Sequence, residues 1–394
     1  MLRLGRAARC TDLCSASRLL FAAVMAALPA LSAKAACAPP PPADDWAVAA
    51  PQAEGLDSQR LCALVPWLET EKQTDIHAVL VARHGQLAFE QYFSGADERW
   101  GTPLGDVAHA RDQLHDARSV TKSVVALVLG IAVDQGLLKL KHGLDTPILD
   151  LLPQYADLRT TKKARITLRH LLTMSAGLKW DEDIPYGDPK NSETQMDRAP
   201  DPARFVLSQP VVAPPGEVYN YSGGSAVLIQ TILKRATGRG LDELTQDLLF
   251  TPLGIAKVEW LRYPATREPI AASGLRLLPR DFAKIGQLVL THGIWAGKQI
   301  VPAPFLAQAT APQINGQGLY FYGYQFWLGR SLVGGREIDW IAAVGLGGQR
   351  IYVVPTLDLV VVINAGLYHS PLQGWVPLAV LNRFVLAAVA APPR

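Results

Sequence analysis

The rest of the chain is built around Arg118-Ser119-Val120-Thr121-Lys122-Ser123 and the apolar run 124–133 that follows it. The stretch places a Ser-x-x-Lys motif at the start of a predicted helix that is apolar on every side and therefore expected to be buried. Because residues three apart share one face of a helix, the Ser119 hydroxyl and the Lys122 amine are expected to meet. The positive end of the helix dipole would also favour an alkoxide forming on Ser119.

This motif indicates a nucleophile with its own base. Burial of Lys122 in the first turn is expected to lower its pKa towards neutrality, and a neutral amine beside a hydroxyl activates that hydroxyl. The alternative is ordinary helix-start chemistry, with Ser119 as an N-cap and Lys122 in solvent. The motif occurs once in the chain and precedes an entirely apolar helix, which favours the catalytic interpretation.

Tyr221 is the candidate for relaying a proton. It belongs to the segment 214–224, in which a Pro-Pro-Gly turn runs into a predicted helix. A nearby lysine ammonium is expected to lower the pKa of the phenol, which would then pass a proton between Ser119 and a leaving group. Packing of Tyr219 and Tyr221 as core aromatics is the alternative.

A glycine-rich segment, Val344-Gly345-Leu346-Gly347-Gly348-Gln349, stands at the head of a predicted strand. Gly347 and Gly348 would let the backbone approach a substrate closely. The backbone N–H groups of Gln349 and Ser119 are then predicted to form an oxyanion hole for a tetrahedral intermediate. A β-bulge or a tight turn explains the same glycines equally well.

The composition is that of a globular protein. The 394 residues are 49% apolar and 19% charged, which is enough for a large core in one domain or in two interlocked ones. The formal charge is +3, but five basic residues against Asp12 give residues 1–35 a charge of +4, which leaves −1 for the remainder. Nothing in this balance indicates a nucleic-acid partner.

Residues 1–36 have the features of a secretory signal peptide, with a basic start, an apolar run over 19–28 and a small-residue end, Ala33-Lys34-Ala35. The apolar run is short for a membrane span, so no stable span is expected after cleavage. We therefore expect a periplasmic or secreted protein. Anchoring as a lipoprotein through Cys37 is disfavoured, because Lys34 stands where an apolar residue is needed.

A Pro/Ala-rich linker is predicted over 37–52, and a single hydrolase domain over 53–394 with a mostly helical subdomain over about 136–270. Cys37 and Cys62 would remain after cleavage of the leader. An oxidising compartment would allow them to pair, and two free thiols are the alternative.

The hydrophobic pattern predicts strands at both ends of this domain and helices in the middle. Predicted strands cover 78–83, 86–92, 323–328, 338–343, 349–354 and 359–364, predicted helices cover 56–71, 119–133, 166–174, 227–234, 277–290 and 376–389, and 94–117 reads as a polar loop. The expected fold class is α/β, an antiparallel sheet from both termini flanked by helices, with a mostly helical insertion. The Ser119 helix would lie where the two parts meet, which is a usual place for a pocket.

Motifs for other chemistries are absent from the sequence. It contains no His-Glu-x-x-His, no Cys-x-x-Cys and no histidine cluster at ligand spacing, so neither a catalytic metal nor another cofactor is expected. The glycine motifs that bind phosphate and the Gly-x-Ser-x-Gly elbow are missing too. His170 falls on an apolar helix face and is expected to be a core histidine.

Taken in order, Ser119-x-x-Lys122, Tyr221-Ser222-Gly223 and Leu346-Gly347-Gly348 resemble the three motifs of serine β-lactamases related to the cephalosporinase type. That group also contains DD-peptidases, esterases and 6-aminohexanoate-dimer hydrolases. The likeness includes segments 166–178 and 274–286 and spans about residues 50–390. It implies a β-lactamase/transpeptidase-like fold in which Ser119 is acylated, Lys122 activates it, Tyr221 is the general acid/base, and the N–H groups of Ser119 and Gln349 hold the oxyanion.

The chain departs from β-lactamases at two positions. Gly223 stands where they have Asn, and Leu346 stands where they have a Lys that helps to hold the β-lactam carboxylate. We therefore expect a serine hydrolase that cleaves a small ester or linear amide. The alternatives are a β-lactamase or DD-peptidase acting on β-lactams or peptidoglycan peptides, and a binding protein that has lost turnover.

The remaining candidates for substrate binding are Gly223, Gly347, Gly348, and Trp180 and Asp181 of the acidic loop Trp180-Asp181-Glu182. The carboxylates of this loop would accept a cationic end of the substrate. A solvated acidic loop is the alternative.

Overall fold

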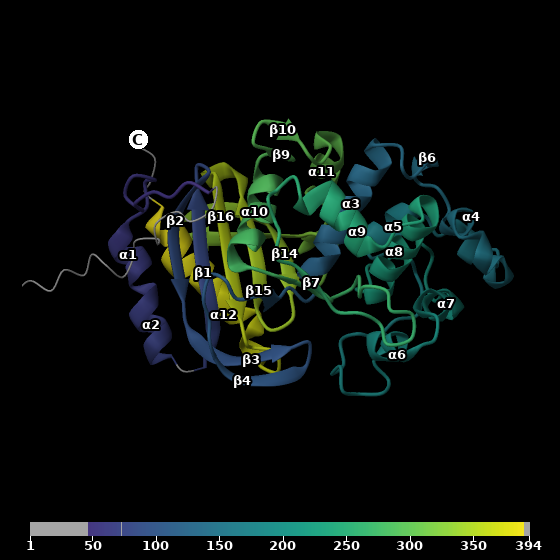
Figure 1. Ribbon diagram of the computed structural model, residues 1–394, viewed down its shortest axis with the longest axis horizontal. Helices are drawn as coiled ribbons and strands as arrows, with labels where there is room; N and C mark the ends of the chain where they lie inside the picture. Colours follow the sequence, from purple (N-terminus) through teal and green to yellow (C-terminus); the bar gives the residue numbers. More distant parts are fainter. Residues whose placement is uncertain (1–45, 72, 390–394) are drawn as a thin grey trace, which may run out of the picture. The chain divides into compact units, whose positions relative to one another are not determined.

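The computed structural model describes residues 46–71 and 73–389, so the predicted signal peptide and residues 37–45 of the predicted linker lie outside the described residues. Strands from both ends of the domain form one eight-stranded antiparallel sheet in the order β11-β12-β13-β14-β15-β16-β1-β2. These strands are β1 (Ile76–Arg83), β2 (Gln86–Tyr92), β11 (Ile314–Asn315), β12 (Phe321–Tyr322), β13 (Trp327–Val333), β14 (Arg336–Gly345), β15 (Gln349–Val354) and β16 (Leu359–Ala365). β1 pairs with β16, with Val79 opposite Ile363, and Figure 1 shows the two side by side.

Both faces of this sheet are covered. Side chains alternate along a strand, and in β1 Leu80 belongs to one core cluster while Val79 and Val81 belong to the other. One face packs against α1 (Ser58–Cys62), α2 (Leu64–Thr70), α12 (Trp375–Ala379) and η6 (Val380–Leu386), and the other packs against α10 (Pro279–Leu290). The predicted α/β class and the sheet built from both termini are confirmed.

The predicted helical insertion is present between the N-terminal and C-terminal strands (Figure 1). It contains β6 (Lys141–Leu144), α4 (Ile148–Leu151), η1 (Pro153–Leu158), η2 (Lys163–Arg165), α5 (Leu168–Leu172), α6 (Ser192–Arg198), α7 (Pro202–Ser208), α8 (Gly223–Thr237), α9 (Leu241–Thr245) and η3 (Gln246–Phe250). The helix after Ser119 is α3 (Val120–Asp134), which packs against α8, α9 and β14 and is buried from Val120 to Ala132. A helix that is apolar on every side therefore lies between sheet and insertion, as expected.

Smaller elements complete the chain. They are β3 (Ser94–Arg99), β4 (Thr102–Ala108), β5 (His115–Asp116), β7 (Glu259–Trp260), β8 (Leu275–Leu277), β9 (Ile294–Trp295), β10 (Lys298–Gln299), α11 (Ala303–Ala309), η4 (Pro355–Leu357) and η5 (Pro371–Gln373). β5, just before Ser119, pairs with β8, which pairs with β7. None of the helices in the described ranges is long and apolar enough to span a bilayer.

Local signals set several boundaries correctly. Thr167 begins α5 through a capping box in which its hydroxyl accepts from the His170 N–H while the His170 ring accepts from the Thr167 N–H. His170 is thus a half-buried capping residue rather than a core histidine. Gly238 ends α8 in the left-handed region, at φ 73°, which glycine adopts without a steric penalty.

Other predictions are corrected. The segment 94–117, expected to be a loop, contains the β3–β4 hairpin, whose exposed strand residues hide the alternating pattern. The helix expected over 56–71 is divided at Ala63, and the closing helix changes from α12 to a π-helical turn, η6. The strand expected over 323–328 begins only at Trp327, after Gln325 at φ 61°.

The end of the predicted linker is part of the domain. Trp46 is 4% exposed and donates its ring N–H to the Gly85 carbonyl, and Val48 pairs with Leu87 of β2. Cys62 is disulfide-bonded. Cys37, its expected partner, lies outside the described residues.

Candidate active site

The structure brings Ser119 and Lys122 together. Lys122 Nζ donates hydrogen bonds to Ser119 Oγ and to the Ala272 carbonyl, both at 3.0 Å, and Lys122 is only 1% exposed. Ser119 occupies the N-cap of α3, but its side chain makes no capping hydrogen bond. The alternative of a capping serine with a solvated lysine is therefore wrong.

Tyr221 is the third member of this group. Its hydroxyl is hydrogen-bonded to Ser119 and to Lys122, and Lys122 Nζ lies 4.9 Å from the centre of its ring. The ring packs against Trp327, with centroids 5.9 Å apart. Tyr219 differs, because it packs against Tyr322 and its hydroxyl has no hydrogen-bond partner within the described residues. The packing interpretation fits Tyr219, and the relay interpretation fits Tyr221.

Two buried glutamates complete the surroundings of Lys122. Its Nζ lies 3.9 Å from a carboxylate oxygen of Glu182 and of Glu193, and both side chains are 3% exposed. Glu182 Oε2 accepts from the Gly223 N–H and from the Trp180 ring N–H, each at 2.7 Å. The two carboxyl groups also hydrogen-bond to each other, which requires that one of them be protonated.

The glutamates change the protonation state expected for Lys122. Burial lowers the pKa of the Lys122 amine, but Tyr221, Glu193 and Glu182 together raise it above the ordinary value. Lys122 is therefore an ammonium, and the prediction of a neutral amine is wrong. The reason is that two acidic side chains of the insertion, Glu182 and Glu193, lie beside it, which its own helix does not reveal.

The prediction that the pKa of the Tyr221 phenol is lowered is also corrected. Burial raises the pKa of this phenol more than the Lys122 ammonium lowers it, so Tyr221 is neutral at rest.

In the carboxyl pair, burial and the Glu182 charge raise the pKa of Glu193 well above its ordinary value. Burial also raises the pKa of Glu182, but Lys122 and its hydrogen bonds lower it further, so the net direction is downward. Glu193 thus carries the shared proton and Glu182 the charge.

A cavity of about 310 Å³ opens onto Ser119. It is lined by Trp100, Gly101, Arg118, Ser119, Tyr186, Glu193, Thr194, Asp197, Arg198, Pro264, Ser273 and Leu346. Its size and its mixture of aromatic and polar groups suit a small ligand. A larger hollow, of about 1140 Å³, lies beside Gly95 and Gly366, but Ser119 does not line it. We assign the active site to the smaller cavity because it contains the nucleophile.

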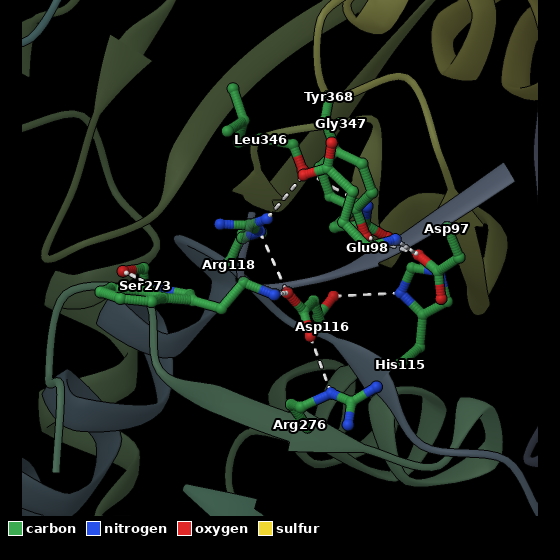
Figure 2. Close-up of polar contacts among 12 residues, drawn as sticks. Asp97, Glu98, His115, Asp116, Arg118, Ser273, Arg276, Leu346, Gly347 and Tyr368 are labelled. Atoms are coloured by element: carbon green, nitrogen blue, oxygen red, sulfur yellow. Dashed lines mark hydrogen bonds and ion pairs between the residues drawn. The ribbon is translucent and has the colours of Figure 1, made fainter. Parts of the chain in front are cut away.

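Arg118 is the buried cation of this cavity, and its charge is neutralised. Its guanidinium lies 3.2 Å from Asp116 and 3.5 Å from Glu98, and Asp116 also contacts Arg276 at 2.7 Å. Figure 2 shows this chain of ion pairs, with the Tyr368 ring beside Arg118. Arg118 therefore fixes the backbone just before Ser119 in a left-handed conformation, at φ 49°.

Gln349 does not line the cavity, and the oxyanion role of its backbone N–H stays a prediction. Gln349 is fully buried, and its side-chain amide donates to the Ala365 carbonyl at 2.6 Å. Leu346 stands at the cavity edge instead, because Gly345 presses against the backbone before Ser119: a Cβ on Gly345 would lie 2.4 Å from the Ala117 carbonyl. Within the described residues, the N–H groups of Ser119 and Leu346 donate no hydrogen bond, so both are free to bind an oxyanion.

The candidate substrate-binding residues do not line this cavity, so their predicted role stays a prediction. Gly347 donates its N–H to the Gln373 side chain and Gly348 follows at φ 97°, so both shape a tight turn outside the cavity. Trp180 and Gly223 hold Glu182 in place and do not line the cavity. Asp181 is exposed, so the solvated alternative holds for it, while its neighbour Glu182 points inward.

Sequence reasoning missed Glu193 and Asp197, which lie one turn apart on α6 and line the cavity. Burial raises the pKa of Asp197 to about 7, helped by the Glu182 charge and opposed by Lys122 and Arg198. The sequence signal that could have found them is the spacing of Glu193 and Asp197, four residues apart in 192–198, which places both on one face of a helix together with Met196. That pattern is shared by solvated helices, so only the packing of α6 identifies these residues.

Comparisons with known proteins agree with this geometry. The family model described as Beta-lactamase matches residues 69–371. The chain is 23% identical over 324 residues to the 6-aminohexanoate-dimer hydrolase of Paenarthrobacter ureafaciens, covering 77% of this chain and 76% of that protein.

Among solved structures, a putative 6-aminohexanoate-dimer hydrolase from Bacillus anthracis superposes with a TM-score of 0.64 at 20% identity, covering 80% of each chain. EstCE1, described as a hydrolase with promiscuous acyltransferase activity, superposes with a TM-score of 0.64 at 17% identity, covering 84% of this chain and all of that one. At these identities the likeness shows the β-lactamase/transpeptidase-like fold.

Proposed function

The chain belongs to the Beta-lactamase family, whose members are serine hydrolases, and we propose that it cleaves a small ester or linear amide through an acyl-enzyme on Ser119. One observation carries this proposal: Lys122 Nζ lies 3.0 Å from Ser119 Oγ, and the Tyr221 hydroxyl is hydrogen-bonded to both residues. A nucleophile, a fixed positive charge and a proton relay then meet at Ser119, which lines the cavity.

In acylation, Ser119 Oγ attacks the carbonyl carbon of the substrate. Its proton passes to the Tyr221 oxygen while the Tyr221 proton passes to the leaving alcohol or amine, so Tyr221 ends neutral. The Lys122 ammonium stabilises the negative charge that develops on the two oxygens beside it. The free N–H groups of Ser119 and Leu346 bind the oxyanion of the tetrahedral intermediate.

Deacylation runs the same relay in the other direction. Water gives a proton to Tyr221 as it attacks the ester carbonyl, and Tyr221 returns a proton to Ser119 Oγ as the acid leaves. The charge balance of the site does not change during the cycle, because Glu182 keeps Lys122 charged throughout.

The substrate class rests on the cavity. Its volume of about 310 Å³ and the rings of Trp100 and Tyr186 suit a small acyl group. No lysine lines it, and Arg118 is already paired with Asp116 and Glu98, so a β-lactam carboxylate would find only the exposed Arg198. These features favour short esters and linear amides over β-lactams or peptidoglycan peptides.

The test is a substrate panel on the purified protein. Short p-nitrophenyl esters and linear amides are expected to be hydrolysed faster than nitrocefin. Nitrocefin turnover near the ester rate would instead support the β-lactamase or DD-peptidase alternative. No turnover of any substrate, together with no reaction of Ser119 with a fluorophosphonate, would support a binding protein.

We also propose that the protein acts in the periplasm or outside the cell. The leader-like composition of residues 1–36 and the disulfide at Cys62 support this location, because disulfides persist in oxidising compartments. Cell fractionation followed by N-terminal sequencing tests it. A mature protein beginning near residue 36 in the periplasm is expected, and an intact Met1 in the cytoplasm would contradict the proposal.

A further inference from the structure

A second polar cluster lies on the other side of Asp116 from Ser119. Four residues that are far apart in the sequence meet there: His77 of β1, Asp97 of β3, His109 after β4, and His115 of β5. Each offers one nitrogen or oxygen atom, and these four atoms all lie within 4.8 Å of one another. The side chains are at most 5% exposed, so the cluster is closed to bulk water.

The spacing of these atoms approaches that of a tetrahedral metal site. Zinc–nitrogen bonds of about 2.0 Å place the ligand atoms of a tetrahedron about 3.3 Å apart. Here His77 Nδ1 and His115 Nε2 are 2.8 Å apart, and Asp97 oxygens lie 3.7 Å from His115 Nε2 and 3.9 Å from His77 Nδ1 and His109 Nε2. The distances fall on both sides of the ideal edge. The His109 ring stacks on the His77 ring, with centroids 3.9 Å apart and planes 15° apart, so the His109 side chain must turn for both rings to point at one ion.

The outer atoms of the cluster are held as metal ligands usually are. His115 Nδ1 faces the Asp116 carbonyl at 3.2 Å, which leaves Nε2 for the centre. Asp75 Oδ1 lies 3.4 Å from His77 Nε2. The Tyr368 hydroxyl donates at 3.0 Å to Asp97 Oδ1, the oxygen that also faces His77 and His115. Carboxylates and carbonyls in this position fix the ring that binds the metal.

Two ring nitrogens of the cluster make no hydrogen bond within the described residues, namely His77 Nε2, which faces Asp75, and His109 Nε2. His109 Nε2 is buried against Asp97 but makes no hydrogen bond within the described residues. An unpaired buried nitrogen is costly, and a hydrogen-bond network among the four residues would leave it so. A metal ion at the centre would satisfy it together with the facing nitrogens of His77 and His115.

We propose that His77, Asp97, His109 and His115 bind one zinc ion. Three imidazole nitrogens and one carboxylate oxygen in a closed four-coordinate site form a ligand set that suits zinc and leaves no open position for substrate. The sequence predicted no metal because the ligands are spread over three strands and the loop after β4.

The ion would have a positioning role. It would tie β1 and the β3–β4 hairpin to β5, whose Asp116 and the neighbouring Glu98 hold Arg118 just before Ser119. Hydrolysis does not require the ion to touch the substrate, so the proposed reaction at Ser119 and the zinc site stand or fall separately.

The experiment uses the full protein without an affinity tag, stripped with a chelator and dialysed. Titration with zinc is expected to restore one zinc per chain by elemental analysis and to raise the melting temperature. Cobalt(II) in place of zinc is expected to give the strong visible absorption of a tetrahedral site. The variant His109→Asn should lose both the bound zinc and the thermal shift, and His142→Asn, on an exposed histidine, should keep both.

A milder variant covers the case in which His109→Asn fails to fold. Asp75→Asn keeps the side-chain shape but weakens the outer contact to His77, and it is expected to reduce zinc affinity about 10- to 100-fold. Less than one zinc per stripped and reloaded wild-type chain would overturn the proposal. So would equal zinc binding by His109→Asn, or one equivalent of copper or nickel taken up with no zinc.

Discussion

Gly223 and Glu193 are in such close contact that no side chain fits between them: a Cβ on Gly223 would lie 2.3 Å from Glu193 Oε2 and 2.9 Å from its carboxyl carbon. β-Lactamases of the resembled type carry an Asn at this position. Here a carboxyl pair from the insertion occupies the space and surrounds Lys122, so this pair and a side chain at position 223 exclude each other.

Gly223→Ala tests this contact. The added methyl group must displace Glu193, and such overpacking typically costs about 1–3 kcal/mol of unfolding free energy. Denaturant unfolding should show this loss, accompanied by reduced hydrolysis. The control is Gly187→Ala, where an added Cβ meets nothing within 4 Å. Equal stability of the two variants would show that the contact is not tight.

Tyr221→Phe removes the proton relay but keeps the ring against Trp327. We expect kcat to fall about 10²- to 10⁴-fold, the usual contribution of a general acid/base, with little change in melting temperature. Tyr219→Phe is the matched control, because its hydroxyl has no partner within the described residues. Comparable kcat values for the two variants would show that the Tyr221 hydroxyl has no part in catalysis.

Glu182→Gln and Glu193→Gln are expected to behave differently although they lie at the same distance from Lys122. Gln mimics a protonated glutamate, so Glu193→Gln should change stability and kcat little. Glu182→Gln leaves a buried ammonium without its charged partner, which typically costs about 3–5 kcal/mol. Denaturant unfolding at neutral pH measures both. Similar losses in the two variants would contradict the assignment of the proton to Glu193.

Asp197 makes folding stability depend on pH. Its pKa is about 7 in the folded protein against an ordinary 3.8, so the folded state binds the extra proton between these values. The contribution of Asp197 to stability therefore falls as the pH rises from about 4 to about 7, and is fully lost above that. Asp197→Asn should flatten this part of the curve of melting temperature against pH. If Asp197→Asn kept the full wild-type dependence of melting temperature on pH, the raised pKa of Asp197 would be refuted.

Much of the architecture could be predicted from local patterns. The run 124–133 has no polar face, so it had to be buried. The predicted strands contain the continuous apolar segments 351–354 and 359–363. The β3–β4 hairpin was missed because most of β4 is exposed and its side chains give no alternating signal.

In the active site, only contacts between residues of the same sequence motif could be predicted. Ser119 and Lys122 share one helix turn, so their contact follows from helix geometry. The charge on Lys122 does not, because Glu182 and Glu193 come from a loop and a helix whose positions depend on tertiary packing. The place of Leu346 at the cavity edge has a similar cause, since it depends on where β14 ends against Ala117.

Ser119→Ala separates a catalytic role from a structural one. We expect kcat to fall roughly 10³-fold or more, because members of such a catalytic unit fail together, while the melting temperature stays close to that of the wild type. The Ser119 side chain makes no capping bond to α3, so its removal costs the helix little. A large fall in melting temperature would indicate a structural residue.

The most direct test is the intact mass of the folded protein after reaction with a fluorophosphonate, followed by peptide mapping. The account predicts a single adduct, located on Ser119, and none on Ser119→Ala. No adduct on protein that hydrolyses esters, or an adduct on another serine such as Ser273 of the same cavity, would contradict it.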